Sequence, residues 1–363
     1  MMRGSFADSG IHREPLRSVA GEERSNKMRI EARAPTRIDL AGGTLDIWPL
    51  YLYHQPAVTL NCAISLYASC QIETHHGSKS IRLISRDTCR EENFSSYRAL
   101  ARASRHKLPL LAQFVRFFAP ETGLTVSTDS EAPAGAGISG SSALAVALSA
   151  AFDRLTGWGR SREDWIHLSR DIEAIVLGVP TGVQDHYPAA FGGVSEIRLL
   201  PAGEERVEAR VEPAELEQRL ILCYTGKPRK SGINNWRVFK SHLEGDRRIH
   251  RNLEEISRIA CEMALQIRRS GWAEVGRLMR EEWSYRRRNL PTISTPTIDR
   301  IISHARRAGA LGGKVCGAGG GGCVAILAQP DARTRIEQAV ASAGGRLLPV
   351  RIDRRGVRVR VLR

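Results

Sequence analysis

A glycine- and serine-rich stretch, EAPAGAGISGSSALAVALSAAF at residues 131–152, contains the residue types that bind phosphate. Its glycines let the main chain approach an anion closely, and Ser142 offers a hydroxyl to a phosphate or to Mg²⁺. Gly135, Gly137 and Gly140 also satisfy the G-x-G-x-x-G pattern of dinucleotide-binding turns. Two nucleotide chemistries therefore compete for the same loop.

The sequence around this loop argues against a dinucleotide. Residues 128–133 separate the loop from the preceding predicted strand, and Pro133 cannot pair within a sheet. Asp153 lies inside the following predicted helix, where an acid is usually only solvated. The backbone N–H groups of residues 137–142 can instead converge on an anion at the helix N-terminus. The loop lacks the lysine of the common P-loop, and a turn that only opens a helix is the alternative.

A second glycine run, GAGGGG at residues 317–322, leads into the predicted strand 323–327 rather than into a helix. Its match to G-x-G-x-x-G is therefore also coincidental. Such a dense run is either a plain flexible turn or backbone packed closely against a ligand. Two glycine loops in one chain favour the ligand.

The elements that would position these loops interleave in both halves of the chain. Apolar and polar residues alternate as in strands over 30–40, 57–71, 81–85, 124–127 and 219–224. Helical spacing or capping signals predict helices over 142–155, 162–176, 251–268, 272–288 and 297–308. The pattern predicts an α+β or α/β protein with a domain boundary near residue 200.

The composition restricts the class of protein. The chain has 363 residues, which favours two domains, and it lacks an apolar run of the length that a membrane span needs. Residues 1–27 mix both charge signs without an apolar centre, so we expect a disordered tail or a start assigned too early rather than a secretory signal. The seven cysteines are scattered without metal-ligand spacing, which predicts reduced thiols in a cytoplasmic protein.

The net charge of +15 raises the question of an anionic partner. The positive charge is spread along the chain, and no recognition-helix, zinc-finger or RNA-binding aromatic signature accompanies it. The alternation in VRVRVLR, residues 357–363, is typical of a solvated edge strand. We therefore expect small anionic molecules, and neither nucleic acid nor a membrane, as partners; the sequence carries no signal for the oligomeric state.

Three motifs in order resemble the GHMP kinase superfamily, named for galactokinase, homoserine kinase, mevalonate kinase and phosphomevalonate kinase. They are APTRIDLAGGTLDIWPLY (34–51), PAGAGISGSSALA (133–145) and GGKVCGAGGGGCVAIL (312–327). The resemblance implies an α+β, two-domain fold with an N-terminal mixed α/β domain that binds ATP and a C-terminal ferredoxin-like α+β domain. We place these domains at residues 28–200 and 201–363.

Finer features resemble the heptose 7-phosphate kinases and the related L-fucose kinases. The second motif has one extra residue before Ser141, TGVQDHYPAAFGG is similar to their G-K-Q-D-Q-Y-A-A-A-F-G-G segment, and CYTGKPR is similar to their Y-T-G segment. Ser139 departs from a usual glycine, Ile138 from a leucine and Thr44–Leu45 from Gly-Thr. The resemblance implies an ATP-dependent sugar kinase that phosphorylates an anomeric hydroxyl. A heptose 7-phosphate is the leading substrate. The alternatives are a kinase for a neutral sugar such as L-fucose or galactose, and a sugar sensor that has the fold but no catalytic activity. A mevalonate-type substrate is a weaker alternative.

The resemblance also implies roles for individual residues. Asp185 would accept the proton of the attacking hydroxyl, and Arg37 would keep it ionised and offset charge on the transferred phosphoryl group. Ser142 and Glu173 would hold Mg²⁺. ATP would lie on Pro133, Gly135, Gly137, Ser139, Gly140, Ser141, Ser142 and Ala143. The substrate would lie on Asp46, Gly43, Thr44, Thr181, Gly182, Gly317, Gly319, Gly320 and Arg229. Each of these charged residues also has a purely structural alternative. Glu173 would be a carboxylate on a helix surface, Asp46 a loop acid and Asp185 a turn-capping aspartate. Arg37 would form a salt bridge at the end of a strand.

Overall fold

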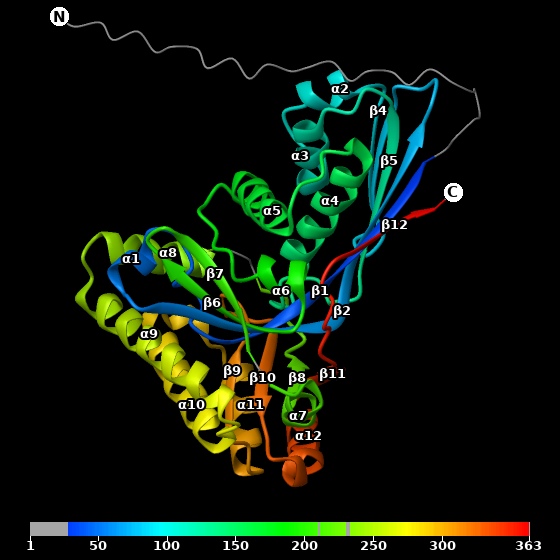
Figure 1. Cartoon of the computed structure of the whole chain (residues 1–363). Helices are drawn as coiled ribbons and strands as arrows, with labels where there is room; N and C mark the ends of the chain where they lie inside the picture. Colours follow the sequence, from blue (N-terminus) through cyan, green and yellow to red (C-terminus); the bar gives the residue numbers. More distant parts are fainter. Residues whose placement is uncertain (1–27, 210, 230–232, 363) are drawn as a thin grey trace, which may run out of the picture.

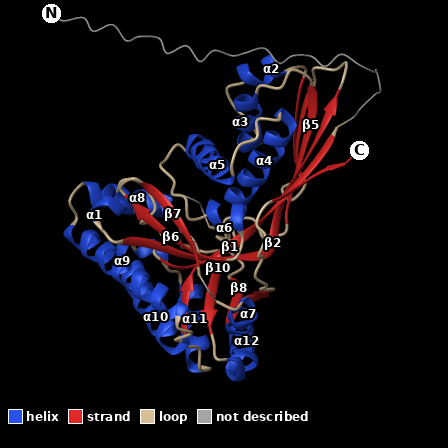
Figure 2. Cartoon of the chain, viewed as in Figure 1, coloured by secondary structure: helices blue, strands red, loops and turns tan. Residues whose placement is uncertain are grey.

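The computed structural model describes residues 28–209, 211–229 and 233–362, which form two β-sheets with helices packed against them (Figures 1 and 2). The predicted tail, residues 1–27, lies outside these described residues. The strands are β1 Arg29–Ala41, β2 Ala57–His75, β3 Ile81–Ser85, β4 Arg90–Phe94, β5 Gly123–Ser130, β6 Val194–Leu200, β7 Gly203–Glu208, β8 Leu220–Tyr224, β9 Gly312–Val315, β10 Cys323–Leu327, β11 Arg346–Leu348 and β12 Arg358–Leu362.

The helices cover both sheets (Figure 2). They are α1 Leu50–Tyr53, α2 Tyr97–Arg102, α3 Pro109–Phe118, α4 Gly140–Thr156, α5 Arg162–Leu177, α6 His186–Phe191, α7 Pro213–Arg219, α8 Ile233–Leu243, α9 Arg247–Arg268, α10 Trp272–Asn289, α11 Pro296–Arg307 and α12 Arg333–Ser342. Within the described part of the chain, none of them has the length and apolar character that crossing a lipid bilayer would require.

The larger sheet is organised by the long strand β2. The strand order is β12-β1-β2-β5-β3-β4, and β6 and β7 continue the sheet from the first half of β2. β2 pairs with β6 through residues 57–62 and with β5 through residues 68–75. One strand thus joins the two ends of the sheet, with α2, α3, α4 and α5 near one end and α1 and α8 near the other (Figure 1). The predicted edge strand at the C-terminus is confirmed, because β12 pairs with β1 at the sheet margin.

Helix α4 is the central helix of this half. Its small side chains, GSSALAVALSAA, are buried on nearly all sides, and it packs against β1, β2 and α5. Alanine and serine allow this close approach to the sheet, which a helix with larger side chains would not reach. The N-terminus of α4 therefore has a fixed position relative to β1.

The smaller sheet has the ferredoxin-like topology. Its order is β11-β8-β10-β9, and all pairs are antiparallel. In chain order the strands lie 4-1-3-2, with helices between the first and second and between the third and fourth, which is the β-α-β-β-α-β pattern. The predicted α+β fold with a ferredoxin-like second part is confirmed.

Some observed elements have no counterpart in the sequence prediction, including β4, α3, α6 and α8. Short helices owe their stability to tertiary packing more than to local propensity, so the periodic signal is weak. β7 and β12 follow residue 200 yet belong to the larger sheet, so the chain passes between the two sheets more than once. The domain boundary near residue 200 stays a prediction.

Candidate active site

A cleft of about 450 Å³ brings most of the predicted residues together. Its wall includes the predicted residues Arg37, Asp46, Pro133, Gly135, Gly137, Ser139, Gly140, Ser141, Ser142, Glu173, Thr181, Gly182, Asp185, Arg229 and Gly317. Segments that are far apart in the chain thus meet at one concave surface that combines hydroxyls, carboxylates, guanidinium groups and a helix N-terminus.

The N-terminus of α4 forms one side of the cleft. Gly135 and Gly137 have φ angles of 67° and 77°, a conformation that glycine adopts without strain. Ser139, which precedes the helix, has a φ of 64°, so the departure from glycine places a serine in the left-handed region. The first helical residues, Gly140 and Ser141, line the cleft with free N–H groups and the positive end of the helix dipole. This side of the cleft is suited to an anion.

Ser142 and Glu173 lie together in the cleft wall. The Ser142 hydroxyl donates a hydrogen bond of 2.8 Å to Glu173 Oε2, and both side chains are buried. His186 Nε2 lies 3.2 Å from the same carboxylate oxygen. A buried carboxylate beside a hydroxyl supplies hard oxygen ligands of the kind that Mg²⁺ prefers. The two residues come from helices α4 and α5, which pack against each other.

Arg37 and Asp185 form an ion pair that the sequence predicted. Arg37 Nε donates to Asp185 Oδ1 at 2.9 Å and Nη2 donates to the same oxygen at 2.5 Å. Arg37 Nη1 also donates to the carbonyl oxygen of Gly137 at 3.1 Å, which ties the pair to the glycine loop. Burial alone would raise the pKa of Asp185, but the Arg37 guanidinium holds it below the usual aspartate value. Asp185 is therefore ionised at neutral pH.

Asp46 lies against the loop that leads to Asp185. Its Oδ2 accepts a 2.9 Å hydrogen bond from the backbone N–H of Gln184. A Cβ atom placed on Gly182 would lie 1.8 Å from the same oxygen, so a side chain there would displace the carboxylate. Burial raises the pKa of Asp46 to about 6, although the Gln184 hydrogen bond opposes the shift. The cleft thus holds two acids with different pKa values.

Arg229 lies between the two glycine loops. Its backbone N–H donates to Gly135 O at 3.1 Å. A Cβ placed on Gly137 would lie 2.8 Å from Arg229 Nε, and a Cβ placed on Gly317 would lie 2.6 Å from Arg229 Nη2. Glycine at these positions leaves room for the guanidinium. Burial and the nearby Arg37 lower the pKa of Arg229, so an anion in the cleft would stabilise its charged form.

A buried ion network behind the cleft was not predicted from the sequence. Asp39 accepts hydrogen bonds from Lys314 Nζ and Arg286 Nη1, both at 3.1 Å, and from the Gly317 N–H at 3.0 Å. Lys314 Nζ also donates to Glu282 Oε1 at 3.0 Å. All four side chains are at most 3% exposed. Despite the opposing effect of burial, Lys314 and Arg37 hold the pKa of Asp39 well below its usual range.

This network fixes the second glycine loop relative to β1. Asp39 Oδ1 lies 3.7 Å from Arg37 Nη1, so the network is continuous with the Arg37–Asp185 pair. Arg286 Nη2 donates to the Gly317 carbonyl oxygen. Asp39 on β1, Glu282 and Arg286 on α10, and Lys314 on β9 are therefore positioning residues for the cleft rather than part of its surface.

Five of the predicted residues pack behind the cleft wall. Ala143 lies in the hydrophobic core, and the Thr44 hydroxyl donates to Asn235 Oδ1 at 3.2 Å. A Cβ on Gly43 would approach Arg286 Nη1 to 2.9 Å. The N–H of Gly320 donates to Ile293 O at 2.8 Å, and a Cβ on Gly319 would lie 2.5 Å from that oxygen.

The cleft wall also contains residues that were missed from the sequence. Charged and polar members of this group include Asp87, Thr88, Arg90, Lys107 and Asn235. Four of them come from the polar, weakly periodic segment between residues 86 and 109, in which no function was recognised. An unusual density of polar residues between two predicted elements was the available signal.

Comparisons with known proteins agree with this arrangement. Residues 100–193 match the family model of the GHMP kinases N terminal domain, and residues 263–346 match the GHMP kinases C terminal model. The D-glycero-alpha-D-manno-heptose 7-phosphate kinase of Campylobacter jejuni is 26% identical over 338 residues, which cover 91% of this chain and 98% of that protein.

Two further relatives extend the comparison. The mevalonate kinase of Thermococcus gammatolerans is 30% identical over 244 residues, covering 65% of this chain and 69% of the relative. The crystal structure of Lactococcus lactis galactokinase complexed with galactose has the same fold, with a TM-score of 0.75 at 16% identity, covering 91% of this chain and 95% of the galactokinase. The chain therefore belongs to the GHMP kinase family and is an ATP-dependent phosphotransferase with an alcohol group as acceptor.

Proposed function

We propose that this chain is a sugar kinase that transfers the γ-phosphate of ATP to the anomeric hydroxyl of a heptose 7-phosphate or a closely similar sugar. The observation that carries the proposal is the ion pair between buried Arg37 and half-buried Asp185, which lies in the same cleft as the N-terminus of α4. The similarity to a heptose 7-phosphate kinase along 91% of the chain supports the choice of sugar. We also propose a cytoplasmic location, supported by seven free cysteines.

Asp185 is the proposed proton acceptor. Its carboxylate is ionised and held in position by Arg37, and one of its oxygens accepts both guanidinium hydrogen bonds. The other carboxylate oxygen of Asp185 accepts the proton of the sugar hydroxyl. The hydroxyl oxygen attacks the γ-phosphorus of ATP in the same step. Arg37 then offsets negative charge that develops on the transferred group. The N–H groups at the N-terminus of α4 hold the ATP phosphates in place.

Mg²⁺ is proposed to bind at Ser142 and Glu173. Their oxygens lie 2.8 Å apart, face the same cleft, and match the oxygen ligands that Mg²⁺ prefers. When bound, Mg²⁺ neutralises charge on the phosphate oxygens. In the described residues the Glu173 carboxylate has the Ser142 hydroxyl and the His186 ring as polar neighbours, so no arginine or lysine side chain competes for it there.

Asp46 is the proposed acceptor for a sugar hydroxyl, and its ionisation predicts a pH dependence. Because burial raises the pKa of Asp46 to about 6, the carboxylate becomes protonated and loses its acceptor charge as the pH falls through 6. We expect kcat/KM for the sugar to fall about tenfold per pH unit below that value. Protonation of Asp185 does not cause this fall in kcat/KM, because Arg37 holds the pKa of Asp185 below the usual aspartate value. The measurement is a kcat/KM profile from pH 4.5 to 8.

The control for this profile is Asp46→Asn. This variant should have a higher KM at every pH and a flat profile around pH 6, because the titrating group is gone. An acid limb that persists near pH 6 in Asp46→Asn would assign the titration to another group.

The sugar is identified by comparing phosphorylated and neutral acceptors. If Arg229 binds the sugar's own phosphate, kcat/KM for a heptose 7-phosphate should exceed that for the free heptose by about 100-fold or more, since charge-assisted hydrogen bonds contribute about 1.5–3 kcal/mol each. Arg229→Ala should then raise KM for the phosphosugar about tenfold or more and leave the neutral sugar nearly unchanged. Lys227→Ala is the matched control, because Lys227 lies in the same segment and is exposed.

Other outcomes have definite meanings. Equal or better use of the free sugar, L-fucose or galactose removes the phosphate pocket and makes a neutral-sugar kinase the function. Equal loss of turnover with both sugars in Arg229→Ala would place Arg229 on the ATP phosphates. A chain that releases no ADP with any sugar but binds one tightly would be a sensor rather than an enzyme.

A further inference from the structure

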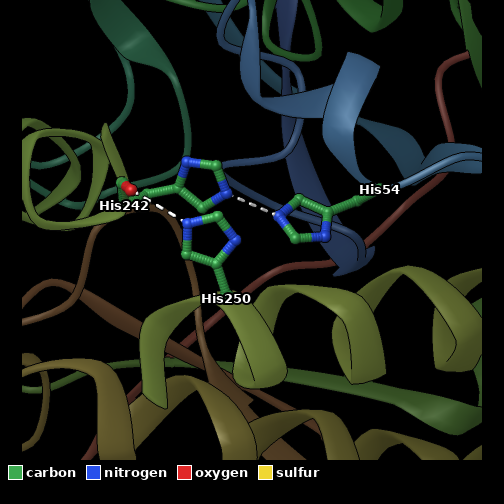
Figure 3. A group of neighbouring side chains, drawn as sticks. All are labelled: His54, His242 and His250. Atoms are coloured by element: carbon green, nitrogen blue, oxygen red, sulfur yellow. Dashed lines mark hydrogen bonds between the residues drawn. The ribbon is translucent and has the colours of Figure 1, made fainter. Parts of the chain in front are cut away.

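Three histidines from separate segments meet away from the cleft (Figure 3). His54 follows α1, His242 lies on the last turn of α8, and His250 lies on the first turns of α9. His54 and His242 are buried and His250 is half-buried. A ring nitrogen from each can be chosen so that all three lie within 4.8 Å of one another. Each buried imidazole has two ring nitrogens, and buried polar atoms are normally bound to a hydrogen-bond partner or to a ligand.

The hydrogen bonds leave lone pairs directed into the cluster. His250 Nε2 lies 3.0 Å from the His242 carbonyl oxygen, which can only accept, so Nε2 carries the proton and Nδ1 of the neutral ring carries the lone pair. A histidine that ligates a metal typically donates its other ring N–H to a carbonyl or carboxylate in this way. Figure 3 shows the second nitrogen of His250 turned toward His54.

The other two rings point their Nε2 atoms at each other. His54 Nε2 and His242 Nε2 are 2.8 Å apart, and two nitrogens at this distance share one proton. A cation can take the place of the shared proton. The proton then moves from Nε2 to Nδ1 of the ring that carries it, and both Nε2 lone pairs become free for the cation. His242 Nδ1 is buried and has no hydrogen-bond partner among the described residues.

We propose that His54, His242 and His250 form a binding site for a divalent transition metal, with Zn²⁺ as the ion to test. Tetrahedral zinc with bonds of about 2.0–2.1 Å places its nitrogen ligands about 3.4 Å apart. The Nε2 atoms of His54 and His242 are 2.8 Å apart, so they would separate slightly to admit the ion. The rings of His242 and His250 are stacked with centroids 3.7 Å apart, so one of them would rotate out of the stack to direct its lone pair at the same ion. Three imidazole nitrogens suit zinc and disfavour Mg²⁺, which prefers oxygen.

The site connects the ends of α1, α8 and α9. The first turn of α8 carries Asn235, which lines the cleft and accepts a hydrogen bond from Thr44. Asn234 in the same turn donates to the Ala318 carbonyl oxygen in the second glycine loop. A metal at the other end of α8 would therefore fix the helix that contacts both the loop after β1 and the second glycine loop.

The test measures metal binding directly, so it is independent of the proposed kinase activity. The full chain, produced without a polyhistidine tag and stripped with a chelator, is titrated with Zn²⁺ by calorimetry. We expect one Zn²⁺ per chain with a Kd at or below about 1 µM, and a higher Tm in its presence. Substituting Co²⁺ should give the strong visible absorption of a four-coordinate ion.

Variants locate the site. His242→Ala and His250→Gln should each weaken Zn²⁺ binding about 100-fold or more, whereas His76→Gln, in the exposed turn after β2, should leave it unchanged. Half-buried His250 is the variant to rely on if His242→Ala fails to fold. The proposal is overturned if the wild-type chain binds no stoichiometric Zn²⁺, or if tight binding survives in folded His250→Gln.

Discussion

Replacing Asp185 with asparagine is expected to lower kcat by about 10²–10⁴-fold while the chain stays folded and binds ATP. The amide keeps the shape of the side chain but cannot take a proton, and losing a positioned proton acceptor has an effect of this size. The Arg37 side chain is 1% exposed, and its Nη2 lies 2.5 Å from Asp185 Oδ1. The substitution therefore also removes the negative charge closest to the buried guanidinium. The measurement is steady-state ADP release with the best sugar, together with nucleotide affinity measured by titration.

The matched control is Asp171→Asn on α5. The Asp171 side chain is 61% exposed and, among the described residues, pairs with Arg170 at the surface, so its loss should leave kcat within about twofold. A kcat for Asp185→Asn within about threefold of the wild-type value would show that Asp185 is not the proton acceptor. The Arg37–Asp185 pair would then have only a structural role.

Lys314→Met is expected to lower the free energy of unfolding by about 3–5 kcal/mol, the cost of removing one partner from a buried ion pair. Lys314 Nζ is the donor to both Asp39 and Glu282, and all three side chains are fully buried. Methionine fills a similar volume but leaves the Glu282 carboxylate without its nearest cation. Urea denaturation of the purified variant measures the effect.

Two controls separate the buried charge from the change of side chain. Lys240→Met removes an exposed lysine that lies 3.6 Å from Glu244, and it should cost no more than about 1 kcal/mol. Lys314→Met combined with Glu282→Leu should recover part of the loss, because no unpaired carboxylate remains at that position. If the double variant is less stable than Lys314→Met by the full cost of a second deletion, the two residues do not act as a pair.

The network also joins the two sheets beside the cleft. Asp39 on β1 holds Lys314 of β9 and the Gly317 N–H, so one carboxylate joins the larger sheet to the second glycine loop. Buried pairs of this kind are retained for geometric specificity in some proteins, at little net gain in stability. Here the geometry they hold is that of Arg37 and, through it, Asp185.

Much of the site was predictable because its parts are local. The loop over residues 133–142 needs glycines for its positive φ angles and a helix start for its N–H groups, and both features are contiguous in sequence. Helices α5, α9 and α10 were predicted within a few residues, since each has a periodic apolar face. Each family motif is likewise a contiguous stretch of sequence, and the resemblance that the motifs carry led to Asp185, Arg37, Ser142 and Glu173.

The pairing of distant residues was decided only by the tertiary structure. Arg37 and Asp185 are 148 residues apart, and Asp39 and Lys314 are 275 apart. Lys314 stands in GGKV, where a lysine between small residues resembles a surface position, yet its side chain is fully buried. Only the packing of β9 against α10 and β1 brings two carboxylates to it.

The same reason explains why Gly43 and Ala143 lie behind the cleft and why the histidine cluster was missed. Sequence spacing along one strand or helix predicts which face a residue occupies, because that depends on the local backbone period. It does not predict which other segment covers that face. The sequence by itself determined the conformation-permitting glycines of the loop before α4, the family and the residue types of the chemistry. The long-range contacts of β1 and β2 with the helices and with the second sheet decided which of those residues meet, because those contacts depend on how the whole chain packs.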